Sequence, residues 1–184
     1  MDKNNLSIVR QQFAQCVFNH TIHEKAADRL RKHENRIKWW NIIFLWLDIL
    51  FLILWIIKDN QILFYFSIAI TAFEILFAFI KKEFSIEEVI QNHKKIAIQF
   101  LWLRWKYENL IVDIMNNSIK SNIISERRDL LQDQYQIICS LSPKTTKKDY
   151  ETTQEDLLWK KNKGEDFTWS DDEINHFLPE TLQI

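Results

Sequence analysis

The chain has 184 residues, of which one is glycine and two are proline. Strand-rich folds need glycine or proline at their turns, and nucleotide-binding Rossmann or P-loop sites need clustered glycines, so a lone Gly164 excludes these classes. The 24 basic and 25 acidic residues give a formal charge of -1, which supplies no general attraction for nucleic acid. We therefore predict an all-α protein and expect no direct binding of nucleic acid.

Residues 1–38 are predicted to form cytoplasmic helices ahead of a membrane segment. Apolar residues recur at helical spacing over residues 6–20, which indicates a short amphipathic helix. Thr21 and Glu24 fit a capping box, so we expect a second helix to begin there and to run toward the membrane.

Two apolar segments, residues 39–57 and 62–80, are each nineteen residues long. At ~1.5 Å per residue each spans roughly 28 Å, close to the thickness of the hydrocarbon layer. Only the four polar residues 58–61 separate them, so we predict an antiparallel transmembrane hairpin over residues 39–80. Five basic residues lie within the ten positions before the first span and two directly follow the second, whereas Lys58 alone lies between them. This distribution predicts that both termini are cytoplasmic.

Two acidic residues lie inside the predicted spans. A carboxylate that faces lipid costs on the order of 3 kcal/mol, so such groups usually face protein or water. Each acid shares a helix face with other polar or small residues, because the spacings are three, four or seven. The predicted intramembrane polar residues are Asn41 and Asp48 in the first span and Ser67, Thr71 and Glu74 in the second, followed by the small Ala78.

Two interpretations of these polar residues are consistent with the sequence. In one, the protonated carboxyls form hydrogen bonds that hold the helices together. In the other, several protomers associate so that the polar faces line a wet, cation-favouring passage. A single hairpin cannot enclose water, so the second interpretation requires a homo-oligomer.

Residues 81–141 are predicted to form a long cytoplasmic helical region. Ser85 and Glu88 fit a capping box at its start. Apolar residues then alternate steps of four and three, with His93 as a polar interruption, which is the pattern of a packing seam. The predicted seam comprises Val89, Ile96, Phe100, Leu103, Tyr107, Leu110 and Ile114. Its partner is either the N-terminal helices or another protomer. Polar residues at 116–122 predict a break in this helix or two separate helices.

Residues 142–184 read as a polar tail with a short C-terminal helix. Residues 142–166 contain Pro143 and Gly164 and are expected to form an exposed linker. Ser170 and Glu173 form a capping box before a few apolar residues, which predicts a helix that docks on the body or on a partner.

The sequence offers little chemistry for catalysis. His20 and His23 lie three apart, but no third ligand completes a metal site. Cys16 and Cys139 form no CxxC motif. We therefore predict neither an enzyme nor a cofactor or metal site.

The organisation resembles that of the SLATT family, on the basis of Ala26-Ala27 with nearby basic residues, the tight hairpin and the long helix that follows. The resemblance covers residues 21 to about 140. It implies a bacterial inner-membrane effector found beside nucleotide-synthesising, nucleotide-sensing or reverse-transcriptase components of antiphage systems. Such an effector assembles in the bilayer, breaches it, and kills or arrests the cell. The alternative is a non-conducting membrane adaptor that recruits a cytosolic partner through its helical region and tail.

Overall fold

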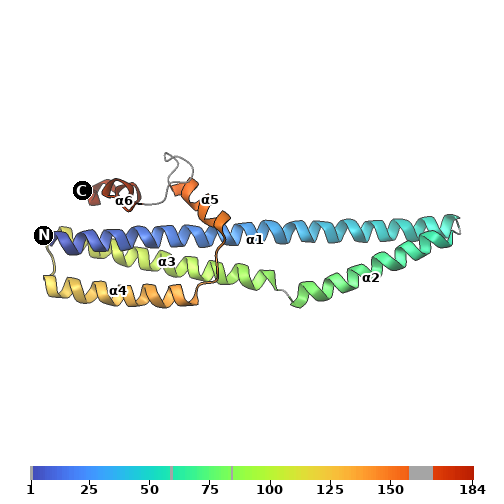
Figure 1. Cartoon of the computed structure of the whole chain (residues 1–184), viewed down its shortest axis with the longest axis horizontal. Coiled ribbons are helices and arrows are strands. Elements are labelled where there is room, and N and C mark those ends of the chain that lie inside the picture. The colour runs from blue at the N-terminus through green and yellow to red at the C-terminus, as the bar shows by residue number, and fades with distance from the viewer. Residues whose placement is uncertain (1, 59, 84, 158–167) are drawn as a thin grey trace. The chain divides into compact units, whose positions relative to one another are not determined.

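The computed structural model describes residues 2–58, 60–83, 85–157 and 168–184, and within them every regular element is helical (Figure 1). The prediction of an all-α fold is confirmed. Gly164 and part of the predicted linker lie outside the described residues. The elements are α1 (Lys3–Lys58), α2 (Gln61–Glu83), α3 (Ile86–Met115), α4 (Ser121–Leu141), α5 (Lys147–Leu157), α6 (Asp171–Phe177) and the 3-10 turn η1 (Glu180–Leu182).

The chain divides into two compact units. Residues 1–27 and 91–184 form one, which we call the bundle unit, and residues 28–90 form the other, the hairpin unit. Helix α1 contributes its first part to the bundle unit and the rest to the hairpin unit. Two long, well-separated segments of sequence are therefore needed to build the bundle unit.

Helix α1 is one unbroken helix of 56 residues. The predicted helix start at Thr21 is wrong, because the Thr21 hydroxyl donates to the carbonyl of Val17, 2.9 Å away, as in a helix interior. A capping box works only where the preceding turn is not helical, and residues 3–58 contain no glycine or proline to end that turn. The N-terminal helix consequently continues directly into the first span.

The core of the bundle unit lies where α1, α3 and α4 run side by side (Figure 1). On α1, Val9 and Phe13 are fully buried, as the helical spacing predicts. The seam of α3 faces this core within the same chain, which answers the question of its partner. The seam residues buried there are Ile96, Phe100, Leu103, Tyr107, Leu110 and Ile114.

Val89 is the exception among the predicted seam residues. Its side chain is 41% exposed, and the neighbouring Ile90 is fully buried instead. His93 is also buried, and it follows Ile90 by three residues. The seam therefore begins at Ile90, three residues before His93, and not at Val89, four residues before it. Both spacings place two residues on the same face of a helix.

A polar turn separates α3 from α4, which confirms the predicted break as two helices. Asn117 adopts φ 51°, a left-handed conformation that asparagine tolerates better than most residues. The amide of Ser118 donates to the carbonyl of Asp113, 3.0 Å away, and closes the end of α3. Antiparallel packing of α3 and α4 follows from this tight connection.

The prediction of an exposed linker over residues 142–166 is wrong for α5. Asp149 and Thr153 of this helix are buried, and the ring of Tyr150 meets that of Phe18 edge to face at 5.3 Å. The carboxylate of Asp149 accepts hydrogen bonds from the amide and hydroxyl of Thr146, which fixes the helix start. With so few apolar residues, α5 gives no hydrophobic pattern that sequence reasoning could detect.

The C-terminal residues dock on the body of the same chain. The predicted capping box of Ser170 and Glu173 is present in α6. Arg10 of α1, whose side chain is fully buried, donates to the carbonyl oxygen of Leu182 at 2.9 Å and to the side-chain oxygen of Asn175 at 2.6 Å. A buried guanidinium is costly unless it is hydrogen-bonded, so these contacts hold the C-terminal segment against α1.

The core packing predicts how substitutions change stability. Ile111→Ala empties a fully buried site on α3 and should lower the free energy of unfolding of the bundle unit by about 2–5 kcal/mol. Ile8→Ala makes the same change at a side chain that is 42% exposed, and should have a much smaller effect. Hydrogen exchange of α3 amides in detergent measures both. Equal effects of the two substitutions would contradict this core.

Candidate functional site

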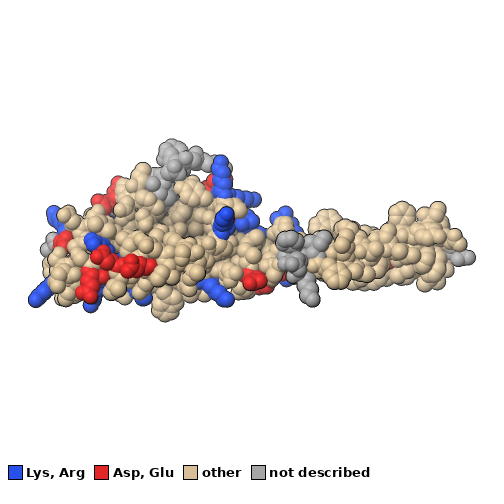
Figure 2. Space-filling view, turned by 60° about the horizontal axis from the view of Figure 1, so that its bottom comes forward, with Lys and Arg blue, Asp and Glu red and all other residues tan. Residues whose placement is uncertain are grey.

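The hairpin unit presents apolar side chains outward along both of its long helices. Two helices, one within α1 and one over Gln61–Phe79, are long and apolar enough to cross a membrane, and only 6% of each apolar window is buried. Trp46 is 68% exposed, and a soluble protein would not leave such a surface in water. On the face that Figure 2 shows, the apolar stretch of this unit carries no charged side chain. Lipid is the solvent that suits it.

The carboxylate of Asp48 is the centre of the polar cluster within this hairpin. Asp48 is 9% exposed, and Ser67 on the facing helix is 3% exposed. The Ser67 hydroxyl donates to Oδ1 of Asp48 at 2.5 Å, and the Thr71 hydroxyl lies 3.0 Å from Oδ2. Each carboxylate oxygen thus accepts from α2, and the two helices are joined across the hairpin at mid-span.

Glu74 lies three residues beyond Thr71 on the same helix. Its Oε1 atom is buried and has no hydrogen-bond partner among the described residues. An unpaired buried carboxyl oxygen costs free energy, whether the group is protonated or ionised. Asn41, two turns before Asp48 on α1, is half-buried. Asp48, Ser67 and Thr71 therefore form one hydrogen-bonded group. The buried Oε1 atom of Glu74 lies outside this group and still needs a hydrogen-bond donor.

A surface groove of about 390 Å³ opens beside this group. Ser67 and Thr71 are its polar lining residues, and the rest of the lining is apolar. The polar cluster is therefore next to a hollow in the outer surface of the hairpin unit rather than sealed in its interior. The apolar lining residues are Leu52, Phe64, Ile68, Ala72 and Ile75.

A second buried polar contact lies in the bundle unit, and sequence reasoning missed it. His23 of α1 and His93 of α3 approach with their Nδ1 atoms 2.8 Å apart, so one ring donates and the other accepts. His23 also stacks on Phe100. His20, by contrast, meets the carbonyl of Ala97 at 2.9 Å. His20 and His23, which lie three apart on α1, thus pack on different partners in α3.

This histidine pair shows no metal-binding geometry. Within residues 2–58, 60–83, 85–157 and 168–184, no three side chains of histidine, cysteine, aspartate or glutamate are grouped to hold a metal. Burial, with a smaller contribution from the neighbouring His93, lowers the pKa of His23 to about 4, and Asp149 opposes the shift. His23 is therefore neutral at physiological pH.

The fold and the polar cluster define an integral membrane protein with a two-helix hairpin and a separate helical bundle. A scan against known protein families matches residues 6–173 to the SMODS and SLOG-associating 2TM effector domain family 4. The chain belongs to this family, which is a SLATT family associated with bacterial conflict systems. The matched region includes the hairpin and nearly all of the bundle unit. Neither the curated proteins nor the solved structures yield a match.

The buried histidine predicts a dependence of stability on pH. The pKa of His23 is 6.5 when unperturbed and about 4 in the folded protein, so the unfolded chain binds more protons between these values. The bundle unit should therefore lose stability as the pH falls from 6.5 toward 4. Thermal melting in detergent at pH 7 and pH 5 measures this loss, which His23→Phe should reduce. An unchanged pH dependence in that variant would contradict the assignment.

Proposed function

We propose that the chain is a membrane effector of a bacterial antiphage defence system, and that copies of it associate in the inner membrane to form a pore or disrupt the bilayer. The observation that carries the proposal is the acidic, hydroxyl-rich cluster of Asp48, Ser67 and Thr71 at mid-span, with the unsatisfied Glu74 one turn further. Intramembrane acids of this kind are costly and are usually kept for a pathway or a contact.

The geometry supports association of several chains. Two helices leave no space for water between them, so a conducting path needs polar faces from more than one hairpin. The groove beside Ser67 and Thr71 gives another chain access to the cluster. Membership of an effector family that is associated with conflict systems supports the same function. Both termini face the cytoplasm in this proposal. Positive charge is concentrated just before the first span and just after the second, and little of it lies in the loop between them.

The upstream component is a nucleotide-synthesising, nucleotide-sensing or reverse-transcriptase protein that triggers the effector. In the alternative proposal, the hairpin only anchors a non-conducting adaptor. The hydrogen bonds of Asp48 favour this alternative in one respect, since they satisfy its carboxylate within a single chain. The two functions differ in whether the charge of the acids matters, and that difference can be measured.

The decisive experiment compares substitutions that separate charge from hydrogen bonding. Asp48→Asn removes the ionisable group but keeps oxygen and nitrogen atoms that can bond to Ser67, whereas Asp48→Leu and Glu74→Leu remove both the ionisable group and the hydrogen-bonding atoms. The proposal expects all three substitutions to slow depolarisation of induced cells at least ten-fold at matched membrane levels. A membrane-potential dye and propidium uptake are the readouts. Phe79→Leu is the control that should keep wild-type behaviour, because this side chain is 69% exposed and lies on α2, the helix of Glu74.

Two results would overturn the proposal that the chain forms a pore. If the cells depolarise equally in the wild type and the three variants, the acids do not line a conducting path. If the wild type never depolarises the membrane, even with the upstream component supplied, the hairpin is an anchor. Replacement of both spans by an unrelated hairpin would then preserve activity.

A further inference from the structure

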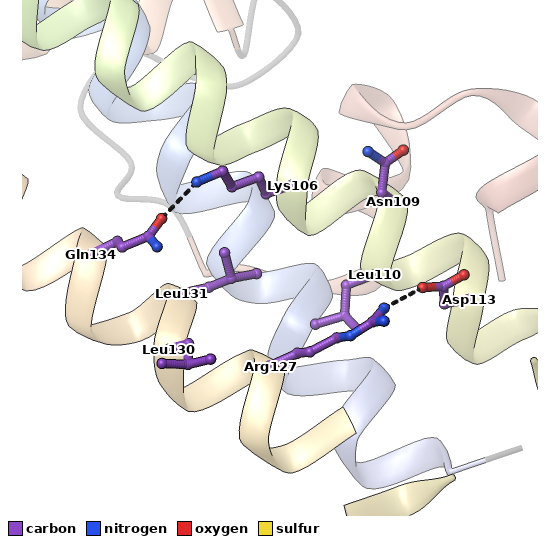
Figure 3. A pocket seen from close by; sticks show the side chains of 8 residues that line it. All are labelled: Lys106, Asn109, Leu110, Asp113, Arg127, Leu130, Leu131 and Gln134. Atoms are coloured by element: carbon purple, nitrogen blue, oxygen red, sulfur yellow. Dashed lines mark hydrogen bonds and ion pairs between the residues drawn. The ribbon is translucent and has the colours of Figure 1, made fainter. Parts of the chain in front are cut away.

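The bundle unit has an apolar face that no described residue covers. It runs along α3 and α4, which are joined by a hydrogen bond from Lys106 to Gln134 of 2.9 Å and an ion pair of Arg127 and Asp113 of 2.7 Å (Figure 3). These contacts line a groove of about 280 Å³. We call the exposed residues beside the groove the α3/α4 face: Ile98, Trp102 and Trp105 of α3 and Leu130, Ile137 and Leu141 of α4.

These six residues form two stripes that border one groove. Ile98, Trp102 and Trp105 are spaced four and three, so they lie on one side of α3, and the next position on that side is Asn109. Leu130, Ile137 and Leu141 are spaced seven and four on α4. Asn109 and Leu130 both line the groove, so the two stripes meet there.

The apolar area of this face is at the upper end of what a monomer usually leaves in water. The six side chains are between 43% and 66% exposed, with Trp105 at the lower limit and Leu141 at the upper. At roughly 100 Å² for each half-exposed large side chain, they present on the order of 600 Å² of apolar surface. A standard interface buries about 800 Å² on each partner, so this face with its polar rim is large enough for a specific contact.

Apart from Asp113 and Arg127, which pair with each other within one chain, exposed charges of opposite sign flank the two stripes. The exposed cations Lys95 and Lys106 flank the stripe of α3, whereas the exposed acids Glu126 and Asp133 flank that of α4. Glu126 and Asp133 form no ion pair with any side chain in the described ranges. Lys106 is level with Gln134, the neighbour of Asp133, so the α3 stripe of one molecule matches the α4 stripe of another in charge at the height of Lys106 and Asp133.

We propose that the α3/α4 face is the surface by which two copies of this chain associate. In this dimer a two-fold axis runs parallel to the helices. The α3 helix of each copy then packs alongside the α4 helix of the other in the antiparallel direction, and each contact occurs twice. Rotation about this axis does not change the position of a residue along it. Residues that are level within one chain, such as Lys106 and Gln134, are therefore level between the two copies as well. Trp102 then lies against Ile137 of the second copy, and Lys106 beside Asp133 of the second copy. The inference deepens the proposed function, since it rests on the association of copies that the pore requires.

The test detects contacts between copies only. Two full-length chains with tags of different size are expressed together in the membrane, both with Cys139→Ser because Cys139 is exposed. One carries Trp102→Cys and the other Ile137→Cys, so oxidation can join them only across a contact between copies. The cross-linked product of mixed size should be at least five-fold more abundant than with Ile8→Cys in place of Trp102→Cys. Ile8 is 42% exposed on α1 and is the matched control.

A charge exchange tests the orientation. Lys106→Glu or Asp133→Lys alone should reduce the cross-linked product, and both together in the same chain should restore it, because the ion pair re-forms with its signs reversed. A product no more abundant than the Ile8 control, or no rescue in the double variant, would overturn the proposal. If Trp102→Cys does not cross-link and resists a water-soluble maleimide in membranes but not in detergent, the face contacts lipid, and the proposal also fails.

The result is independent of the pore. Asp48→Leu changes only the hairpin unit, so the cross-link should persist in that variant even if depolarisation is lost. Persistent cross-linking without depolarisation in the wild type would remove the conducting function and leave the dimer surface. Depolarisation by the wild type without cross-linking would remove the dimer surface and leave the conducting function.

Discussion

The lipid bilayer is the constraint on which the rest of this structure depends. In hydrocarbon every backbone amide and carbonyl must find its partner within the chain, and the α-helix does this within a single segment. Helix α1 meets the requirement through the first span and continues for more than half its length outside it. The same unbroken backbone that crosses the membrane therefore supplies Val9 and Phe13 to the core of the bundle unit. A single glycine or proline near residue 21 would have allowed two separate helices.

Two of the buried polar groups illustrate different solutions to one energetic problem. In the hairpin, the Asp48 carboxylate accepts hydroxyl hydrogen bonds from Ser67 and Thr71, which are short side chains that need little space between helices. In the bundle unit, the buried His23 is neutral at physiological pH and shares a hydrogen bond with the ring of His93. The first group places an acid where a charge is most expensive, whereas in the second the buried His23 stays neutral. This contrast is why the hairpin cluster, and not the histidine pair, is the candidate for function.

Much of the fold was predictable because it is encoded in local patterns. Nineteen-residue apolar runs, the four polar residues between them and the apolar seam of α3 all follow from helical geometry, and the structure has them. The failures come from features that depend on distant residues. Thr21 has the sequence of a helix cap but lies inside a helix, and α5 is buried through Asp149 and Tyr150 rather than through a hydrophobic stripe. The candidate residues of the spans were found because acids at depth are rare, whereas the pairing of His23 with His93 across 70 residues left no signal in the sequence.

The hydrogen bond from Arg10 to Leu182 joins residues 172 positions apart, and this separation has a consequence for biosynthesis. The first turns of α1 emerge from the ribosome long before α3, α4 and α6 exist to cover them. Both spans are made in the interval, so they are available for insertion before the bundle unit can close. During that time Phe13 and its apolar neighbours have no native partner. Insertion of the hairpin and completion of the bundle are thus consecutive events of one pathway, and a chain that stalls between them exposes an apolar helix to chaperones and proteases.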